Sequence, residues 1–186
     1  MWISISDGQA NIYLRHLKHY YTALLKKWRK YMANIHIVVG SVMGTAYGVA
    51  FSVKAVLEGL GHSVNIIEHF KPDNFPGGNL SHCLSDGSLV LVCTSNTGMG
   101  DLPESIASFY THLINDNPPI YGLRYGLINL GDSSYPNFGE AGIRLDETLS
   151  DLGARRIGDL LTLDAIEAVN PEDSAASWIA EWQKLL

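Results

Sequence analysis

IHIVVGSVMGTAY, the stretch from Ile35 to Tyr47, decides the fold of this 186-residue chain. Its first part is mostly apolar and β-branched up to Gly40, a pattern typical of a central parallel strand that is buried on both faces. A short turn then leads directly into a run with helical composition. A buried strand, a tight turn and a helix in this order predict an α/β protein built on a parallel sheet.

The turn between the predicted strand and helix has the composition of an anion site. Its glycine and its small, hydroxylated residues let backbone N–H groups and hydroxyls converge at the N-terminus of the helix, where a phosphate is stabilised. An ordinary strand-to-helix turn, with Ser41 as the helix N-cap, is the alternative. The candidate phosphate-binding residues are Ser41, Val42, Met43, Gly44, Thr45 and Ala46.

From Met32 onward, predicted strands and helices alternate with the regularity of a doubly wound sheet. Glycines mark the end of the first helix at Gly59, and Pro103 suits the first position of another helix. The predicted strands cover residues 35–40, 63–68, 88–94, 125–130 and 155–163, and the predicted helices cover residues 47–59, 103–115, 140–152 and 173–186, with a further short helix near Leu80.

Two later stretches, CTSNTGMGDLP (Cys93–Pro103) and LGDSSYPNFG (Leu130–Gly139), carry a family resemblance. Together with the first loop, and in this order, they make the chain similar to the short-chain flavodoxins. The likeness is strongest to the MioC-like group and to the FMN domains of diflavin reductases. It implies a flavodoxin-like, doubly wound, five-stranded parallel sheet over residues 32–186, with strand order 2-1-3-4-5 and helices on both faces.

The resemblance also implies FMN as the cofactor. The first loop matches the FMN-phosphate loop of the family, and the two later stretches match the loops that hold the isoalloxazine ring. Ligands of such sheets lie beyond the carboxyl ends of the strands, between the first and third. By this resemblance the cofactor-binding residues of the later loops are Ser95, Asn96, Thr97, Gly98, Leu130, Gly131, Asp132, Tyr135, Asn137 and Phe138.

This chain departs from the family pattern around the predicted flavin. Tyr135 stands where the family stacks an aromatic ring on the flavin, and Gly98 matches a glycine whose peptide carbonyl turns toward the flavin on one-electron reduction. Thr97, however, replaces the second aromatic residue of diflavin reductases. Met43 and Ala46 replace residues that carry hydroxyl groups in typical flavodoxins. We therefore expect a flavin that is more open on one side and a phosphate that is held less firmly.

The charge is divided unevenly along the chain. Residues 1–31 hold six Lys/Arg and one Asp, a net charge of +5, and the other 155 residues hold seven Lys/Arg and eighteen Asp/Glu, a net charge of −11. An acidic domain repels nucleic acid but attracts a basic protein partner. Simple solubility is the alternative explanation of the acidic charge. We expect no nucleic-acid partner.

Residues 1–31 read as a basic amphipathic helix that precedes the domain. Leu14, Leu17, Tyr21, Leu24 and Trp28 recur at spacings of three and four, with basic residues between them. We expect this segment to be an extension or the product of an upstream start codon. A helix that packs on the domain and a helix that lies on an anionic membrane are the alternatives.

The residues offer little support for an enzyme. No constellation for hydrolysis is visible, no GxGxxG follows the first strand, and we predict neither catalytic residues nor metal ligands. Cys83 and Cys93 lack metal-site or redox-pair spacing, and Cys93 lies in an apolar run that predicts a buried structural thiol. The chain also lacks an apolar run long enough to span a membrane and a secretory signal. We expect a cytoplasmic monomer.

By resemblance, the expected function is single-electron transfer. The protein would take electrons from an NAD(P)H-dependent flavodoxin-type reductase and pass them to an acceptor protein that the sequence does not identify. An FMN-dependent quinone or small-molecule reductase is one alternative, although the chain has no inserted loop to build a substrate pocket. A flavin-binding interaction module is the other.

Overall fold

The computed structural model describes residues 14–21, 32–167 and 170–186. The chain divides into two compact units, Met1–Met32 and Ala33–Leu186. In the first unit residues 14–21 form a helix, and the rest of the predicted amphipathic segment lies outside the described residues. The second unit contains the sheet and all three loops identified from the sequence.

The second unit alternates strands and helices as predicted. Its strands are β1 Asn34–Gly40, β2 Ser63–Ile67, β3 Leu89–Ser95, β4 Arg124–Gly131, β5 Arg155–Arg156 and β6 Leu161–Asp164. Its helices are α2 Thr45–Gly59, α3 His82–Asp86, α4 Glu104–Asp116, α5 Glu140–Asp151 and α6 Pro171–Trp182, with 3-10 turns at Pro72–Asn74, Pro76–Gly78 and Gln183–Leu185.

The strands form one parallel sheet in the order β2-β1-β3-β4-β5, which confirms the predicted order. The single fifth strand predicted over residues 155–163 is wrong in detail, because β5 and β6 pair with successive parts of β4 instead. Gly158 lies between them in the left-handed region (φ 65°) and packs against Leu185. Trp182 donates its indole N–H to the Ile157 carbonyl at 2.7 Å, so α6 contacts the chain where the strand is interrupted.

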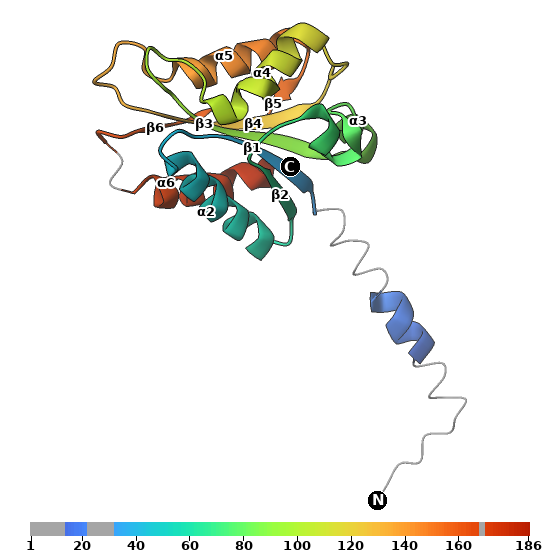
Figure 1. Ribbon diagram of the computed structural model, residues 1–186. Coiled ribbons are helices and arrows are strands. Elements are labelled where there is room, and N and C mark those ends of the chain that lie inside the picture. The colour runs from blue at the N-terminus through green and yellow to red at the C-terminus, as the bar shows by residue number, and fades with distance from the viewer. Residues whose placement is uncertain (1–13, 22–31, 168–169) are drawn as a thin grey trace, which may run out of the picture. The chain divides into compact units, whose positions relative to one another are not determined.

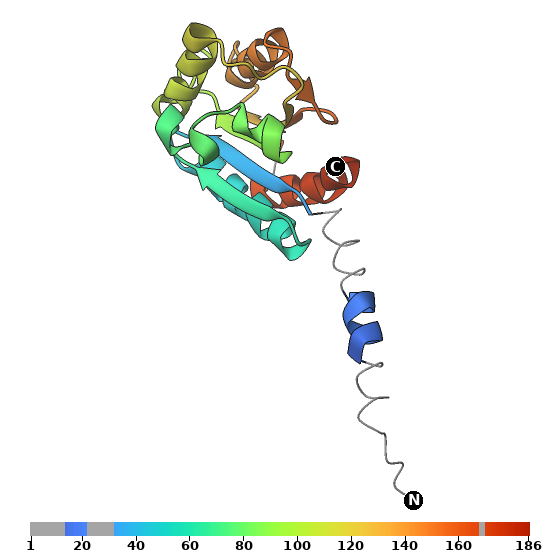
Figure 2. The ribbon, with the colours of Figure 1, turned by 90° about the vertical axis from the view of Figure 1, so that its right-hand side faces the viewer.

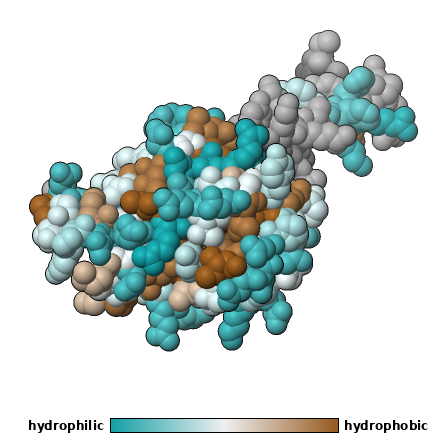
Figure 3. Space-filling model, turned by 90° about the horizontal axis from the view of Figure 1, so that it is seen from above, coloured by the Kyte–Doolittle hydropathy of each residue, from teal (hydrophilic) through white to brown (hydrophobic). Residues whose placement is uncertain are grey.

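Helices cover both faces of the sheet, as predicted. Figures 1 and 2 show α4 and α5 on one side and α2 and α6 on the other. On the side where Figure 1 shows α4 and α5, hydrophilic groups and smaller apolar groups alternate over the surface (Figure 3). Because helices pack on both faces, the sheet divides the core into two apolar layers.

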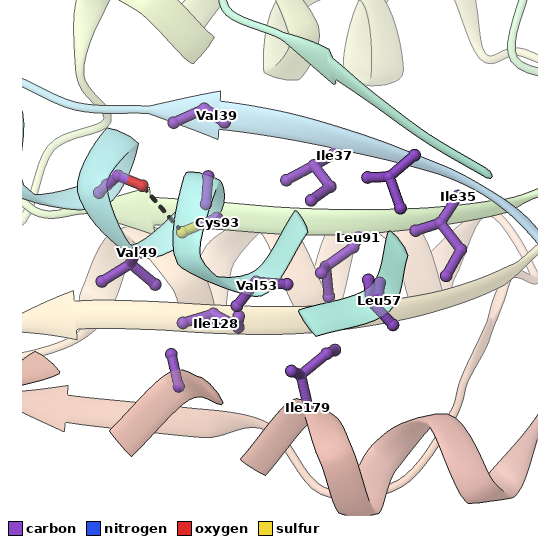
Figure 4. Packing of buried hydrophobic residues seen from close by; sticks show 14 of the residues in the cluster. Ile35, Ile37, Val39, Val49, Val53, Leu57, Leu91, Cys93, Ile128 and Ile179 are labelled. Atoms are coloured by element: carbon purple, nitrogen blue, oxygen red, sulfur yellow. Dashed lines mark hydrogen bonds between the residues drawn. The ribbon is translucent and has the colours of Figure 1, made fainter. Parts of the chain in front are cut away.

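The layer under α2 and α6 is formed by side chains that alternate along β1 and β3. Ile35, Ile37 and Val39 pack with Leu91 and Cys93 beneath α2 (Figure 4). Cys93 is fully buried, and its thiol donates to the Ala46 carbonyl at 3.4 Å. The prediction of a buried structural thiol at this position is confirmed.

Close packing of α4 fixes the end of β1. A Cβ at Gly40 would lie 2.5 Å from Ile106 Cγ2 and 2.6 Å from Thr94 Oγ1, so only glycine lets the helix approach so closely. The loops after β1, β3 and β4 all leave from this edge of the sheet (Figure 1). The three predicted site loops are therefore brought together by the fold.

Candidate functional site

The loop after β1 turns sharply into α2. Gly44 has φ 92° and is the N-cap, so α2 begins at Thr45, two residues before the predicted start at Tyr47. Gly44 donates its N–H to Ser41 Oγ at 3.0 Å, and its carbonyl accepts from the Tyr47 N–H at 3.0 Å. The Ser41 side chain thus shapes the loop and keeps its own hydroxyl proton available.

The first turn of α2 suits an anion. Among the described residues, no hydrogen-bond acceptor contacts the N–H groups of Val42, Met43, Thr45 or Ala46. The first turn of α2 also lacks an acidic residue, whereas α4, α5 and α6 each have at least one there. The positive end of the helix dipole therefore faces no acidic side chain from α2 itself, although Glu172 of α6 packs at Gly48, just beyond this turn.

Ser105, which sequence reasoning missed, holds the first loop from α4. The Ser41 N–H donates to Ser105 Oγ at 3.0 Å, and Ser105 Oγ donates back to the Ser41 carbonyl at 3.3 Å. Nothing in the local pattern ESIAS marks this residue, because the contact crosses sixty-four positions of sequence. The Ser41 N–H is consequently not available to a ligand.

The loop after β3 forms a tight turn. Thr97 and Asp101 exchange two backbone hydrogen bonds of 2.9 and 2.8 Å, and Gly98 lies at the tip with φ 48°. A Cβ at Gly98 would meet only Asp101 Oδ2, at 3.9 Å. The peptide at Gly98 is thus the exposed tip of a turn whose ends are fixed.

The loop after β4 presents Tyr135 with 63% of its surface exposed. The Tyr135 N–H donates to the Asp132 carbonyl at 3.1 Å, which closes a turn before the ring. Asp164, at the end of β6, accepts from the N–H groups of Ser133 and Ile166, each at 3.1 Å. Hydrogen bonding from the Ser133 side chain, with these two N–H groups, holds the pKa of the Asp164 carboxyl below its usual value.

One cavity of about 580 Å³ lies between the three loops. Of the sixteen residues predicted from the sequence, thirteen line it. Gly44 does not line it because it caps α2, Ala46 is buried under Cys93, and Phe138 packs against Gly131. The predicted lining residues are Ser41, Val42, Met43, Thr45, Ser95, Asn96, Thr97, Gly98, Leu130, Gly131, Asp132, Tyr135 and Asn137.

The cavity is also lined by four residues that were not predicted, Leu163, Asp164, Ala165 and Pro171. Leu163 and Asp164 end β6, which pairs with β4 beside the third loop, and Ala165 follows directly. The rule that places ligands at the carboxyl ends of parallel strands points to this segment too. Applying that rule to the fifth strand as well as to the first, third and fourth would have found them.

Asn96 lines the cavity and also joins the loops around it. Its amide nitrogen donates to the Asn137 carbonyl at 2.9 Å, and its amide oxygen accepts from the Ala141 N–H at 3.1 Å. Ser95 similarly directs its hydroxyl to the Gly40 carbonyl, at 3.4 Å. Both side chains are engaged in joining the loops and strand ends.

The surroundings of the cavity are acidic. Asp132 and Asp164 line it, Asp101 is exposed beside Thr97, and Glu140 packs on Gly100 at the rim. Among the described lining residues there is no lysine or arginine. The acidic rim would therefore repel a ring that carries negative charge and attract a basic partner.

Within the described residues, no group of three or more His, Cys, Asp or Glu side chains is arranged to hold a metal ion. No helix in that part of the chain combines the length and the apolar composition needed to cross a membrane.

Comparison with known proteins agrees with this geometry. Residues 37–178 match the family described as Flavodoxin. The chain is 40% identical over 155 residues to Flavodoxin YqcA of Pectobacterium carotovorum subsp. carotovorum, covering 83% of this chain and 98% of that protein. It is 31% identical over 155 residues to Protein MioC of Escherichia coli, covering 83% and 99% of the two chains.

Two further similarities extend the comparison. An NADPH-dependent diflavin oxidoreductase of Emericella nidulans is 34% identical over 155 residues, which are 81% of this chain and 22% of that protein. A solved structure of a flavodoxin variant from Pseudomonas aeruginosa is 34% identical, with a TM-score of 0.71, covering 82% of this chain and 98% of that one. The predicted resemblance and fold class are both confirmed.

Proposed function

The chain belongs to the flavodoxin family and is an FMN-binding protein of electron transport, and from this premise we propose that it carries single electrons from an NAD(P)H-dependent reductase to an acceptor protein. FMN supplies a ring that accepts and releases electrons one at a time. The remaining question is how the residues of this chain would hold that group and admit a partner. The observation that carries the proposal is the cavity that all three loops bound.

The first loop fits the phosphate of FMN. Four backbone N–H groups that have no partner among the described residues, and the hydroxyls of Ser41 and Thr45, lie at the N-terminus of α2. A dianion there is stabilised by aligned peptide dipoles without a basic side chain. The volume of about 580 Å³ also lies in the range of cofactor pockets.

The second and third loops fit the flavin ring. Tyr135 offers an exposed aromatic face, and a stacked ring is worth about 0.5–1.5 kcal/mol beyond area burial. Thr97 lines the same cavity with a smaller side chain. The absence of lysine and arginine among the described lining residues disfavours extra negative charge on the ring, which makes the reduced group a better electron donor.

The rim fits a basic partner. Asp101 and Glu140 are exposed next to loops that line the cavity, and Met43 and Met99 expose 89% and 72% of their surfaces around its mouth. Carboxylates steer a basic protein to the cavity, and exposed apolar groups are covered when it docks. A flavodoxin-type reductase is the partner that this chemistry and the resemblance to diflavin oxidoreductases favour.

The test is reduction of the FMN-loaded protein by NADPH and a flavodoxin-type reductase, followed by flavin absorbance. We expect the rate to fall several-fold when ionic strength rises from ~0.05 to ~0.5 M, because salt screens exposed charges. Asp101→Lys should slow the reaction at low salt only. Glu58→Lys is the matched control, because it makes the same change of charge at a residue near the C-terminal end of α2 that does not line the cavity and that pairs with Lys54.

Two results would contradict the proposal. If NADPH reduces the protein and a quinone is turned over without any reductase, the chain is a small-molecule reductase. If the rate is independent of salt and Asp101→Lys matches Glu58→Lys, the acidic rim does not guide docking.

A further inference from the structure

Asn129 is a buried polar residue that lies beneath the cavity without lining it. It belongs to β4, on the same face of the sheet as Tyr125 and Leu127, and only 1% of its surface is exposed. Its amide nitrogen donates to the Gly139 carbonyl at 2.6 Å. A carbonyl can only accept, so this contact fixes which end of the amide is the donor.

Two glycines make room for this side chain. A Cβ at Gly142, in the first turn of α5, would lie 2.3 Å from Asn129 Cγ, and one at Gly139 would lie 2.9 Å from its Nδ2. The amide is thus enclosed by the start of α5, and its oxygen has no partner among the described residues. Since a buried unpaired oxygen is unfavourable, the position is not explained by stability alone.

Gly139 is the point at which the third loop joins α5. It is the N-cap of the helix, it has φ 75°, and no side chain on the helix itself caps this end. Its carbonyl accepts both from Asn129 and from the Ile143 N–H, at 3.1 Å, in the first turn. At the other end of the loop, Gly131 packs directly on Phe138. Asn129 therefore anchors the loop after β4 at the point where the loop joins α5.

Two more amides connect that loop to the one after β3. Asn96 supplies the missing cap, because its Oδ1 accepts from the Ala141 N–H at 3.1 Å while its Nδ2 donates to the Asn137 carbonyl. Asn137 Nδ2 in turn donates to the Met99 carbonyl at 2.6 Å, next to Gly98. The loops that carry Tyr135 and Gly98 are thus one hydrogen-bonded unit, anchored to the sheet by Asn129.

We propose that Asn129 is a positioning residue for the flavin: by holding Gly139, it sets the place of the Tyr135 loop and, through Asn137, of the Gly98 turn. The inference rests on the assignment of FMN to this cavity. Asn129 acts through the Gly139 backbone and is not among the residues that line the cavity. Loss of its donor should loosen the loop pair while leaving the sheet intact.

The experiment compares Asn129→Ala and Asn129→Asp with wild-type protein. Aspartate keeps the shape but offers only oxygens to the Gly139 carbonyl, so both variants lose the donor. FMN titration by fluorescence quenching should show a dissociation constant raised by about tenfold in both. Backbone amide exchange of the apoprotein should accelerate about tenfold over residues 131–143 and stay unchanged in β1 and β3.

Leu127→Ala is the matched control, because Leu127 is buried two residues earlier on the same face of β4. It should lower the melting temperature at least as much as Asn129→Ala, yet leave the FMN dissociation constant within about twofold. FMN affinity that is unchanged in both Asn129 variants, or exchange that accelerates over the whole sheet, would overturn the inference. Failure of wild-type protein to bind FMN would reject the cofactor site instead, and the exchange pattern of the apoprotein would still decide the part of Asn129.

Discussion

Ser41 and Ser105 are joined by a reciprocal pair of hydrogen bonds, from the Ser41 N–H to Ser105 Oγ at 3.0 Å and from Ser105 Oγ to the Ser41 carbonyl at 3.3 Å. One hydroxyl on α4 therefore fixes the peptide that opens the phosphate loop. The loop leads from β1 to α2, which lies on the opposite face of the sheet from α4. Its shape therefore depends on how closely α4 packs at Gly40.

Ser105→Ala should weaken FMN binding by about two- to tenfold, because each neutral hydrogen bond contributes about 0.5–1.5 kcal/mol. Ser108→Ala is the control, since Ser108 is on the same helix and donates to the Phe70 carbonyl at 2.6 Å, outside the lining of the cavity. Fluorescence titration of both apoproteins with FMN measures the effect. Equal affinities for the two variants would show that the Ser41 peptide needs no support from α4.

Tyr135→Ala should lower FMN affinity by about tenfold for each ~1.4 kcal/mol of stacking and burial that is lost. Thr97→Ala should do much less, because the methyl and hydroxyl of threonine cover little of a ring. Thr97→Tyr should tighten binding by adding a second aromatic face. The same titration compares all three variants. If the Tyr135→Ala protein binds FMN as tightly as the wild type, the third loop does not contact the flavin ring.

Gly142→Ala should destabilise the protein by about 1–3 kcal/mol, although alanine normally favours a helix interior by about 1 kcal/mol over glycine. The cause is the overlap of the new Cβ with Asn129, at 2.3 Å from Cγ. In the double variant Asn129→Ala/Gly142→Ala the overlap disappears, so the two losses should not add. Urea unfolding of the four proteins gives the coupling, and strictly additive losses would place the strain elsewhere.

Both cysteines should resist a thiol reagent at pH 8 in the native protein. Cys83 is 2% and Cys93 0% exposed, and burial raises the pKa of both thiols, that of Cys83 to about 12. The reactive thiolate form of both cysteines is then scarce at this pH. Reaction with Ellman's reagent should be slow until denaturant is added, when two thiols should react. A fast native reaction of either thiol would contradict the described packing.

Removing residues 1–31 should leave folding and FMN binding unchanged. Ala33–Leu186 is a compact unit by itself, and β1 to β6 with all three loops lie within it. Thermal unfolding and FMN titration of the truncated and full-length proteins test this. Aggregation or loss of FMN from the truncated protein would show that the basic segment completes the domain.

The sequence by itself determined the sheet and the place of the site. The apolar run from Ile35 to Gly40 predicts a strand that is buried on both faces, and the regular alternation of strands and helices predicts a parallel sheet with its ligands at the edge formed by the carboxyl ends of the strands. The strand order and the two later loops of the site were implied by the resemblance to flavodoxins. Since that edge is set by topology, thirteen of the sixteen predicted residues line one cavity. Local patterns suffice wherever a position depends on its neighbours in sequence.

Only the tertiary structure decided how the loops are held. Ser105 and Asn129 bear on the site through hydrogen bonds to distant or non-lining backbone, and Asn96 joins two loops through two such bonds. The break in the fifth strand likewise depends on Trp182 and Leu185 packing at Gly158. The physical reason is the same in each case. A hydrogen bond or a close contact between distant residues depends on which surfaces pack together, and periodicity along the chain does not predict that.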